Sequence, residues 1–174
     1  MKPRRRIIAV DPGTVVAGVA VADHDCDSGK NLELLDCAAI AVEGSRPFRL
    51  NWLREKLDLF FKKWATERVD VCVERAWVGK NPQTAIIIGE ARGVVLASAG
   101  AIRRARFFDY APYDVKKSVA GHRSAEKYLV AQVVRSILRI PDEIELPLDA
   151  TDAAAILVHH YLQGNKLHPY EREV

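Results

Sequence analysis

The chain has 174 residues, of which 49% are hydrophobic and 28% are charged, a length and composition typical of one globular domain with a sizeable core. Its 26 Lys and Arg residues exceed its 23 Asp and Glu residues by only 3, which does not by itself indicate a polyanion partner. No apolar run reaches the roughly 18 residues of a membrane span, and the 3 cysteines lack the spacing of a zinc site or a disulfide framework. We expect one domain over residues 1–174, cytoplasmic and without a membrane partner.

The first forty residues predict a meander of three strands. The runs "IIAVD" (7–11) and "VVAGVAVAD" (15–23) flank a Pro-Gly turn, and both are rich in β-branched residues, as antiparallel strands are. The segment "DHDCDSGKN" (23–31) predicts a surface loop. The run 32–42 predicts the third strand.

The hydrophobic period then changes. Apolar residues recur at helical spacing and predict about four turns of amphipathic helix packed on the sheet: Leu53, Leu57, Phe60, Phe61 and Trp64. The apolar run "VDVCVE" (69–74) is typical of a buried central strand, and it ends on Glu74.

A second helix is predicted within residues 81–100. Its isoleucines and valines wrap more of the helix than one stripe would need. One side can face the sheet, and the other, near Gly89 and Gly93, can meet a second subunit. A central helix within a monomer explains the pattern equally well.

The last third of the chain predicts one strand followed by helices. In chain order we expect a strand in 105–112, a short helix over 112–120, a longer helix over 124–140, a proline-bounded loop over 141–148, a helix over 149–162 and a loose polar tail over 164–174.

Four carboxylates stand at the ends of these elements. Asp11 and Glu74 each end a strand, and Asp149 and Asp152, three residues apart, share one face at a helix start. Acids that converge without bases between them repel one another, and hard cations such as Mg²⁺ offset that repulsion. Two such ions about 3.5 to 4 Å apart can clamp the oxygens of a phosphoryl displacement.

Each acid alone has a simpler explanation. Asp11 can form the turn, Asp149 can be the N-cap of its helix, and Glu74 can be an exposed strand end. Only the four acids taken together favour a metal site.

Four motifs in order, from Ile7 to about Leu162, resemble the RuvC family of Holliday-junction resolvases: "AVDPGT…GVAV", "VCVERAWVGKNPQTAIIIGEARGVV", "YDVKKSVAGHRSAEK" and "DATDAAAIL". The resemblance implies an RNase H-like α/β fold, with a mixed five-stranded sheet and helices on both faces. It also implies a homodimer that cuts symmetric strands of a four-way DNA junction, with two Mg²⁺ ions bound by Asp11, Glu74, Asp149 and Asp152. Whether Mn²⁺ substitutes is open, and a branch-migration helicase is a candidate partner.

Further residues match basic and aromatic positions of the family. Lys116 and Lys127 match two basic residues near the scissile phosphate, where a lysine neutralises developing charge; the alternative is that both are exposed helix lysines. Trp77 matches an aromatic that stacks on bases at the junction centre; core packing is its alternative. The remaining candidates for DNA binding are Arg75, Lys80, Lys117 and Arg123.

The chain departs from the family in its basic loop, where Gly121 is followed by His122 and Arg123 rather than by a second glycine. We expect a stiffer and more cationic segment there. The hypothesis for the reaction is that Asp11 bridges both ions and that Lys127 or Lys116 stabilises the charged transition state.

Three rival interpretations remain. "DPGT" also resembles the phosphate-binding loop of actin-like sugar kinases, although those enzymes need two lobes. An RNase H-like enzyme of the YqgF type, acting on RNA, shares the fold. The third rival is a junction-binding module without catalytic activity.

Overall fold

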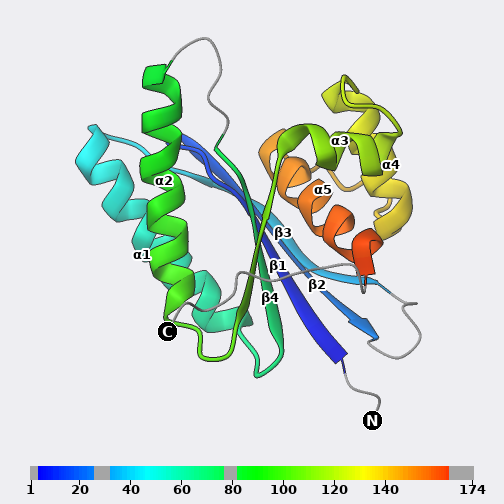
Figure 1. Cartoon of the computed structure of the whole chain (residues 1–174), viewed down its shortest axis with the longest axis horizontal. Helices are drawn as coiled ribbons and strands as arrows, with labels where there is room; N and C mark the ends of the chain where they lie inside the picture. The colour runs from blue at the N-terminus through cyan, green and yellow to red at the C-terminus, as the bar shows by residue number, and fades with distance from the viewer. Residues whose placement is uncertain (1–3, 26–31, 77–81, 165–174) are drawn as a thin grey trace.

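The strands form one mixed sheet of five strands in the order β3-β2-β1-β4-β5 (Figure 1). This computed structural model describes residues 4–25, 32–76 and 82–164. Strand β1 pairs antiparallel with β2 and parallel with β4, which is parallel to β5. The strands are β1 Arg4–Asp11, β2 Val16–Asp25, β3 Glu33–Ala41, β4 Val69–Glu74 and β5 Arg106–Tyr110. The predicted mixed five-stranded sheet is confirmed.

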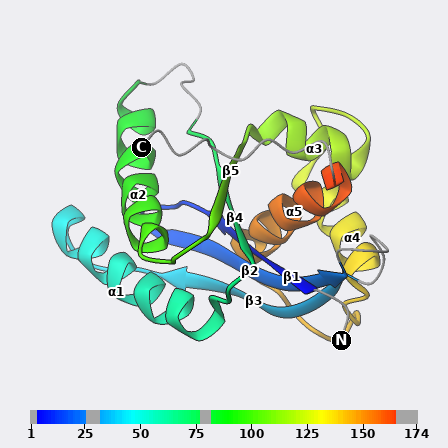
Figure 2. The same cartoon turned by 60° about the horizontal axis from the view of Figure 1, so that its bottom comes forward.

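Helices cover both faces of the sheet (Figure 2). On one face lie α1 Arg46–Trp64 and α2 Pro82–Gly100, and on the other lie α3 Pro112–Ala120, α4 Lys127–Leu138 and α5 Leu148–Gln163. None of the described helices is long and apolar enough to cross a membrane.

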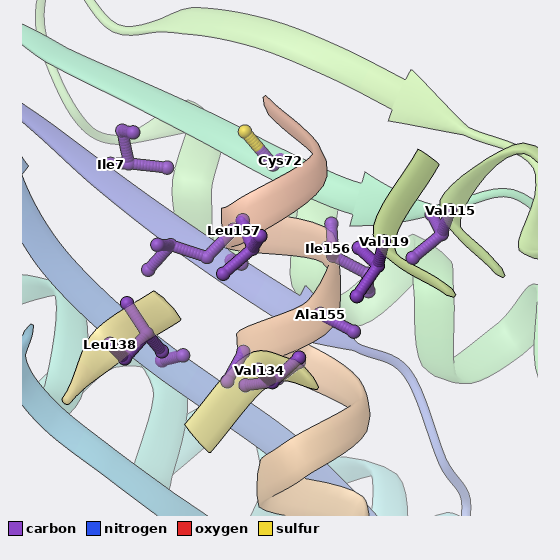
Figure 3. Close-up of a cluster of buried hydrophobic side chains, with 14 of the residues drawn as sticks. Ile7, Cys72, Val115, Val119, Val134, Leu138, Ala155, Ile156 and Leu157 are labelled. Carbon is purple, nitrogen blue, oxygen red and sulfur yellow. The ribbon is translucent and has the colours of Figure 1, made fainter. Parts of the chain in front are cut away.

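Strand alternation divides the interior into two cores. Successive side chains of a strand point to opposite faces of the sheet, so Ile8 of β1 packs under α1 and α2 whereas Ile7 packs with α5. Figure 3 shows the α5 core, with Ile7 and Cys72 of the sheet near Leu157. By the same alternation Asp11 and Glu74 face α5.

Strand β2 is longer than the sequence predicts. The predicted strand ends at residue 23, but residues 24 and 25, expected in the loop, continue it, and residues 26–31 lie outside the described chain. The guanidinium of Arg6 donates two hydrogen bonds of 2.8 Å to Asp23 across the ladder. This ion pair compensates the charge of Asp23, so the polar residues at this end of β2 can form a strand.

Two helix bounds also differ from expectation. Helix α1 has 19 residues, or about five turns at 3.6 residues per turn, rather than four. Helix α4 begins at Lys127 rather than at Ser124, because Glu126 has the extended backbone of an N-cap. Of the predicted tail, residues 165–174 lie outside the described chain.

Candidate active site

Two parallel strands bring the first two carboxylates to one edge of the sheet. Strands β1 and β4 are neighbours, and the last residues paired between them are Val10 and Val73. Asp11 and Glu74 follow these residues directly, so both carboxylates stand at the same carboxyl-terminal edge.

Helix α5 supplies the other two carboxylates. Its N-cap is Pro147, which makes no side-chain capping bond, so the interpretation of Asp149 as an N-cap is wrong. Asp149 lies within the first turn, and Asp152 follows three residues later on the same face.

A cavity of about 220 Å³ joins the strand ends to the helices. Its lining residues are Asp11, Glu74, Pro112, Val115, Lys116, Lys127, Val130, Asp152 and Ala155. The structure therefore brings three of the predicted acids and both predicted lysines together. Asp149 does not line the cavity, although its charge acts on Asp11.

Burial and mutual repulsion raise the pKa values of the two strand carboxylates. The pKa of Asp11 rises to about 6, first through burial and then through the charge of Asp152. The pKa of Glu74 rises to about 8, again through burial first and then through Asp11 and Asp152. It is therefore energetically unfavourable for both carboxylates to be ionised at once unless more positive charge lies beside them.

Lys127 supplies part of that positive charge. Its Nζ donates a 2.5 Å hydrogen bond to Oδ2 of Asp152, which raises the pKa of Lys127. The lysine side chain is 59% exposed, so this ion pair is open to solvent on one side. Lys127 also lowers the pKa of Asp11 and of Glu74 against the effect of burial.

Within the described ranges, no three His, Cys, Asp or Glu side chains stand in positions to hold a metal ion. The four predicted ligands are gathered at one sheet edge but not closed into a coordination shell, and Asp152 points an oxygen at Lys127. The donor set still fits a hard cation, since it consists of carboxylate oxygens, and burial and neighbouring acids raise the pKa values of Asp11 and Glu74, as they would where a cation is missing.

Gly18 is a part of the site that the sequence analysis missed. It pairs with Asp11 across the β1–β2 ladder, and a Cβ built on it would lie 1.9 Å from the backbone oxygen of Asp149. Only glycine lets the first turn of α5 come this close to β2. The signal was available, because an isolated glycine inside a strand often marks a close backbone approach.

The predicted DNA-binding residues lie around this edge as far as they are described. Arg75 is exposed directly after β4, and Lys117 is exposed on α3. Arg123 is exposed just beyond α3 and lies 4.9 Å from the Tyr113 ring centroid. Trp77 and Lys80 lie outside the described residues.

The basic loop begins at a constrained residue. Gly121 caps the C-terminus of α3 with φ of 87°, a left-handed conformation that glycine adopts without steric cost. The loop that carries His122 and Arg123 therefore leaves α3 at a defined angle.

A mixed five-stranded sheet of this order, with helices on both faces and acids at the ends of adjacent parallel strands, defines an RNase H-like protein. The sequence profile described as "Crossover junction endodeoxyribonuclease RuvC" matches residues 7–160. The chain therefore belongs to the RuvC family, as its motifs had indicated.

Individual relatives agree with this assignment. The chain is 35% identical over 166 residues to the RuvC crossover junction endodeoxyribonuclease of Pelotomaculum thermopropionicum, covering 92% of this chain and 97% of the relative. It is 30% identical over 155 residues to that of Finegoldia magna, covering 89% and 92%. The structure of Thermus thermophilus RuvC in complex with a Holliday junction substrate matches with a TM-score of 0.79 and 25% identity, covering 95% of this chain and 99% of the other.

Proposed function

We propose that this protein is an endonuclease that resolves four-way DNA junctions in recombination and repair by hydrolysing phosphodiesters of symmetric strands. The observation that carries the proposal is the cavity in which Asp11, Glu74 and Asp152 meet Lys116 and Lys127. Acids paired with lysines suit cation-assisted cleavage of a phosphodiester, because the acids hold cations and the lysines attract the DNA backbone.

Divalent metal dependence follows from membership of this nuclease family. We infer that the metal is Mg²⁺, that two ions bind, and that Asp11, Glu74, Asp149 and Asp152 are the ligands. Such ions would activate a water molecule and stabilise charge on the scissile phosphate.

The protein's own residues have distinct roles in this proposal. Asp11 and Glu74 are each held by a strand that is paired on both sides, which makes them rigidly placed ligands. Lys127, once released from Asp152, and Lys116 on α3 would place positive charge beside the phosphate as its charge develops.

Symmetric cleavage needs two active sites, and we infer that a homodimer supplies them. Helix α2 offers a surface for the second subunit: Ile86 is 53% exposed, and Gly89 and Gly93 have open space where a Cβ would stand. Small residues allow close helix approach. The four-way junction itself is the proposed substrate, and a branch-migration helicase is a candidate partner.

An Asp11→Asn variant tests the proposed function. It should reduce cleavage of a synthetic four-way junction to background in Mg²⁺ while junction binding persists, because the amide removes a charged ligand but not the basic surface. Cleavage and binding are measured on gels, and EDTA should abolish only the cleavage. The matched control is Asp58→Asn, an exposed carboxylate on α1, which should cut like the wild type.

If Asp11→Asn cut the junction as fast as the wild type does, the assignment of the metal ligands would be wrong. The same gels with a plain duplex and an RNA–DNA hybrid separate junction resolution from the rival RNase H-like activity. If the protein cleaved the RNA–DNA hybrid in preference to the junction, RNase H-like cleavage would replace junction resolution as the proposed function.

A further inference from the structure

A chain of buried polar side chains lies at the opposite end of α5 from the candidate active site. His160 is 2% exposed and Asp70 is 1% exposed. Nε2 of His160 lies 3.0 Å from Oδ2 of Asp70, and Nδ1 lies 2.7 Å from the hydroxyl of Tyr110. One histidine thus connects α5 to both β4 and β5.

The protonation of this chain follows from its partners. Asp70 also accepts hydrogen bonds from Arg5 at 3.0 Å and from Arg106 at 2.7 and 2.6 Å. Burial acts to raise the pKa of Asp70, but the bonds from His160 and Arg106 lower it to about 2. Asp70 is therefore an ionised acceptor, so Nε2 of His160 donates to it and Nδ1 accepts from Tyr110.

The distance between Asp70 and Glu74 along β4 is close to the distance between His160 and Asp152 along α5. Asp70 and Glu74 share one face of β4, four residues or about 13 Å apart. Asp152 and His160 are eight residues, or about 12 Å, apart along α5. Asp152 lies near enough to Glu74 to raise its pKa, while His160 bonds to Asp70. Helix α5 thus interacts with β4 at two places, His160 with Asp70 and Asp152 with Glu74, and these places are about the same distance apart on the helix and on the strand.

We propose that His160, held between Asp70 and Tyr110, sets the axial position of α5 on β4 and so positions Asp152 against Glu74 for metal binding. These are positioning residues and do not touch the substrate. The inference rests on the proposed function, in which the carboxylates hold cations. Helix α5 is rigid and well packed (Figure 3), so a shift at one end moves the other.

The chain contains a matched control beside His160. His159 is 3% exposed, and its Nδ1 lies 2.5 Å from the hydroxyl of Ser118 on α3. Both histidines are buried and each bonds a hydroxyl through Nδ1. Of the two histidines, His160 alone makes a side-chain hydrogen bond to a described residue of β4, the strand that carries Glu74.

The test compares His160→Gln with His159→Gln in metal binding without DNA. Glutamine offers a donor and an acceptor on a flexible side chain rather than on a rigid ring, so it should loosen the bonds to Asp70 and Tyr110 without leaving either partner in an apolar environment. Mn²⁺ affinity is measured by electron paramagnetic resonance titration, and the free energy of unfolding by urea. His160→Gln should weaken Mn²⁺ binding roughly 10- to 100-fold, the range for groups that orient metal ligands. His159→Gln should lose stability but keep near wild-type affinity.

Tyr110→Phe is the second variant, because it removes one hydroxyl and leaves the Asp70 bond in place. It should weaken Mn²⁺ binding by less than His160→Gln does, and it provides the measurement if His160→Gln does not fold. Equal affinities in the wild type, His160→Gln and Tyr110→Phe would overturn the inference and leave the proposed function standing. So would equal losses in His160→Gln and His159→Gln. A wild type that binds no Mn²⁺ would overturn both proposals.

Discussion

At the scale of single residues, Gly18 is sterically constrained by helix α5. A Cβ at this position would lie 1.9 Å from the Asp149 backbone oxygen and 3.1 Å from the Ala153 side chain. Neither group can move aside without moving the first turn of α5. Gly18 therefore determines how closely α5 approaches β2 at the candidate site, although it has no side chain of its own.

A Gly18→Ala variant should separate stability from activity. Overpacking of this kind typically costs about 1 to 3 kcal/mol of unfolding free energy. Displacing Asp149 and Asp152 by even about 1 Å should reduce junction cleavage on the order of 100-fold. Urea unfolding and junction gels measure the two effects.

Gly100→Ala is the control, since open space surrounds that glycine at the end of α2. It should cleave like the wild type. If Gly18→Ala cut junctions as fast as Gly100→Ala, the close approach to Asp149 would have no bearing on the site.

Glu74 gives the metal-free protein a pH-dependent stability. Its pKa is raised from 4.5 to about 8 in the folded protein, so between these values the folded state holds a proton that the unfolded state has released. The free energy of unfolding should therefore fall as pH rises through this window. Urea unfolding in EDTA at about pH 5 and about pH 8 measures the change.

A Glu74→Gln variant should reduce this dependence because glutamine does not titrate, and part of the slope should remain because the pKa of Asp11 is also raised, to about 6. The exposed Glu55 on α1 provides the control, and Glu55→Gln should keep the wild-type slope. An unchanged slope in Glu74→Gln would mean that Glu74 does not carry a raised pKa.

At the scale of elements, the short central strand β4 followed directly from its local pattern. Val69–Glu74 was expected as a strand and is β4, because a short run of β-branched residues suits a buried position. In α5, all residues from Ala153 to His160 are buried. A helix buried nearly all round has no polar stripe, so only the motif and not the pattern indicated which face carries the acids.

The buried face of α1 agrees with the helical spacing of its apolar residues. Leu53, Leu57 and Phe61 are buried as expected, while Phe48 is 74% exposed and Leu59 is 64% exposed on the same helix. Phe48 and Leu59 fall outside the spacing of the buried residues, so the pattern already separates the two groups.

At the scale of the whole molecule, the proposed homodimer predicts that a charge on the open face of α2 prevents association. Gly93→Glu fits the free chain without a clash, because no atom lies within 4 Å of the added Cβ. In a dimer the same carboxylate would be desolvated and repelled by its copy. The variant should sediment as a monomer, whereas the wild type should sediment as a dimer.

The control for this prediction is Leu59→Glu on α1, which is exposed but lies on a different helix. It should remain dimeric. A dimeric Gly93→Glu would exclude the α2 face as the interface.

The sequence by itself determined the family, the five strands and the order of the four acids, because these depend on local periodicity and on motifs. Tertiary structure decided how those acids meet. The hydrogen bond between Lys127 and Asp152, the approach of Asp149 to Gly18, and the contact of His160 with Asp70 join residues far apart in the chain. No local pattern encodes such contacts, since they arise only when separate elements pack together.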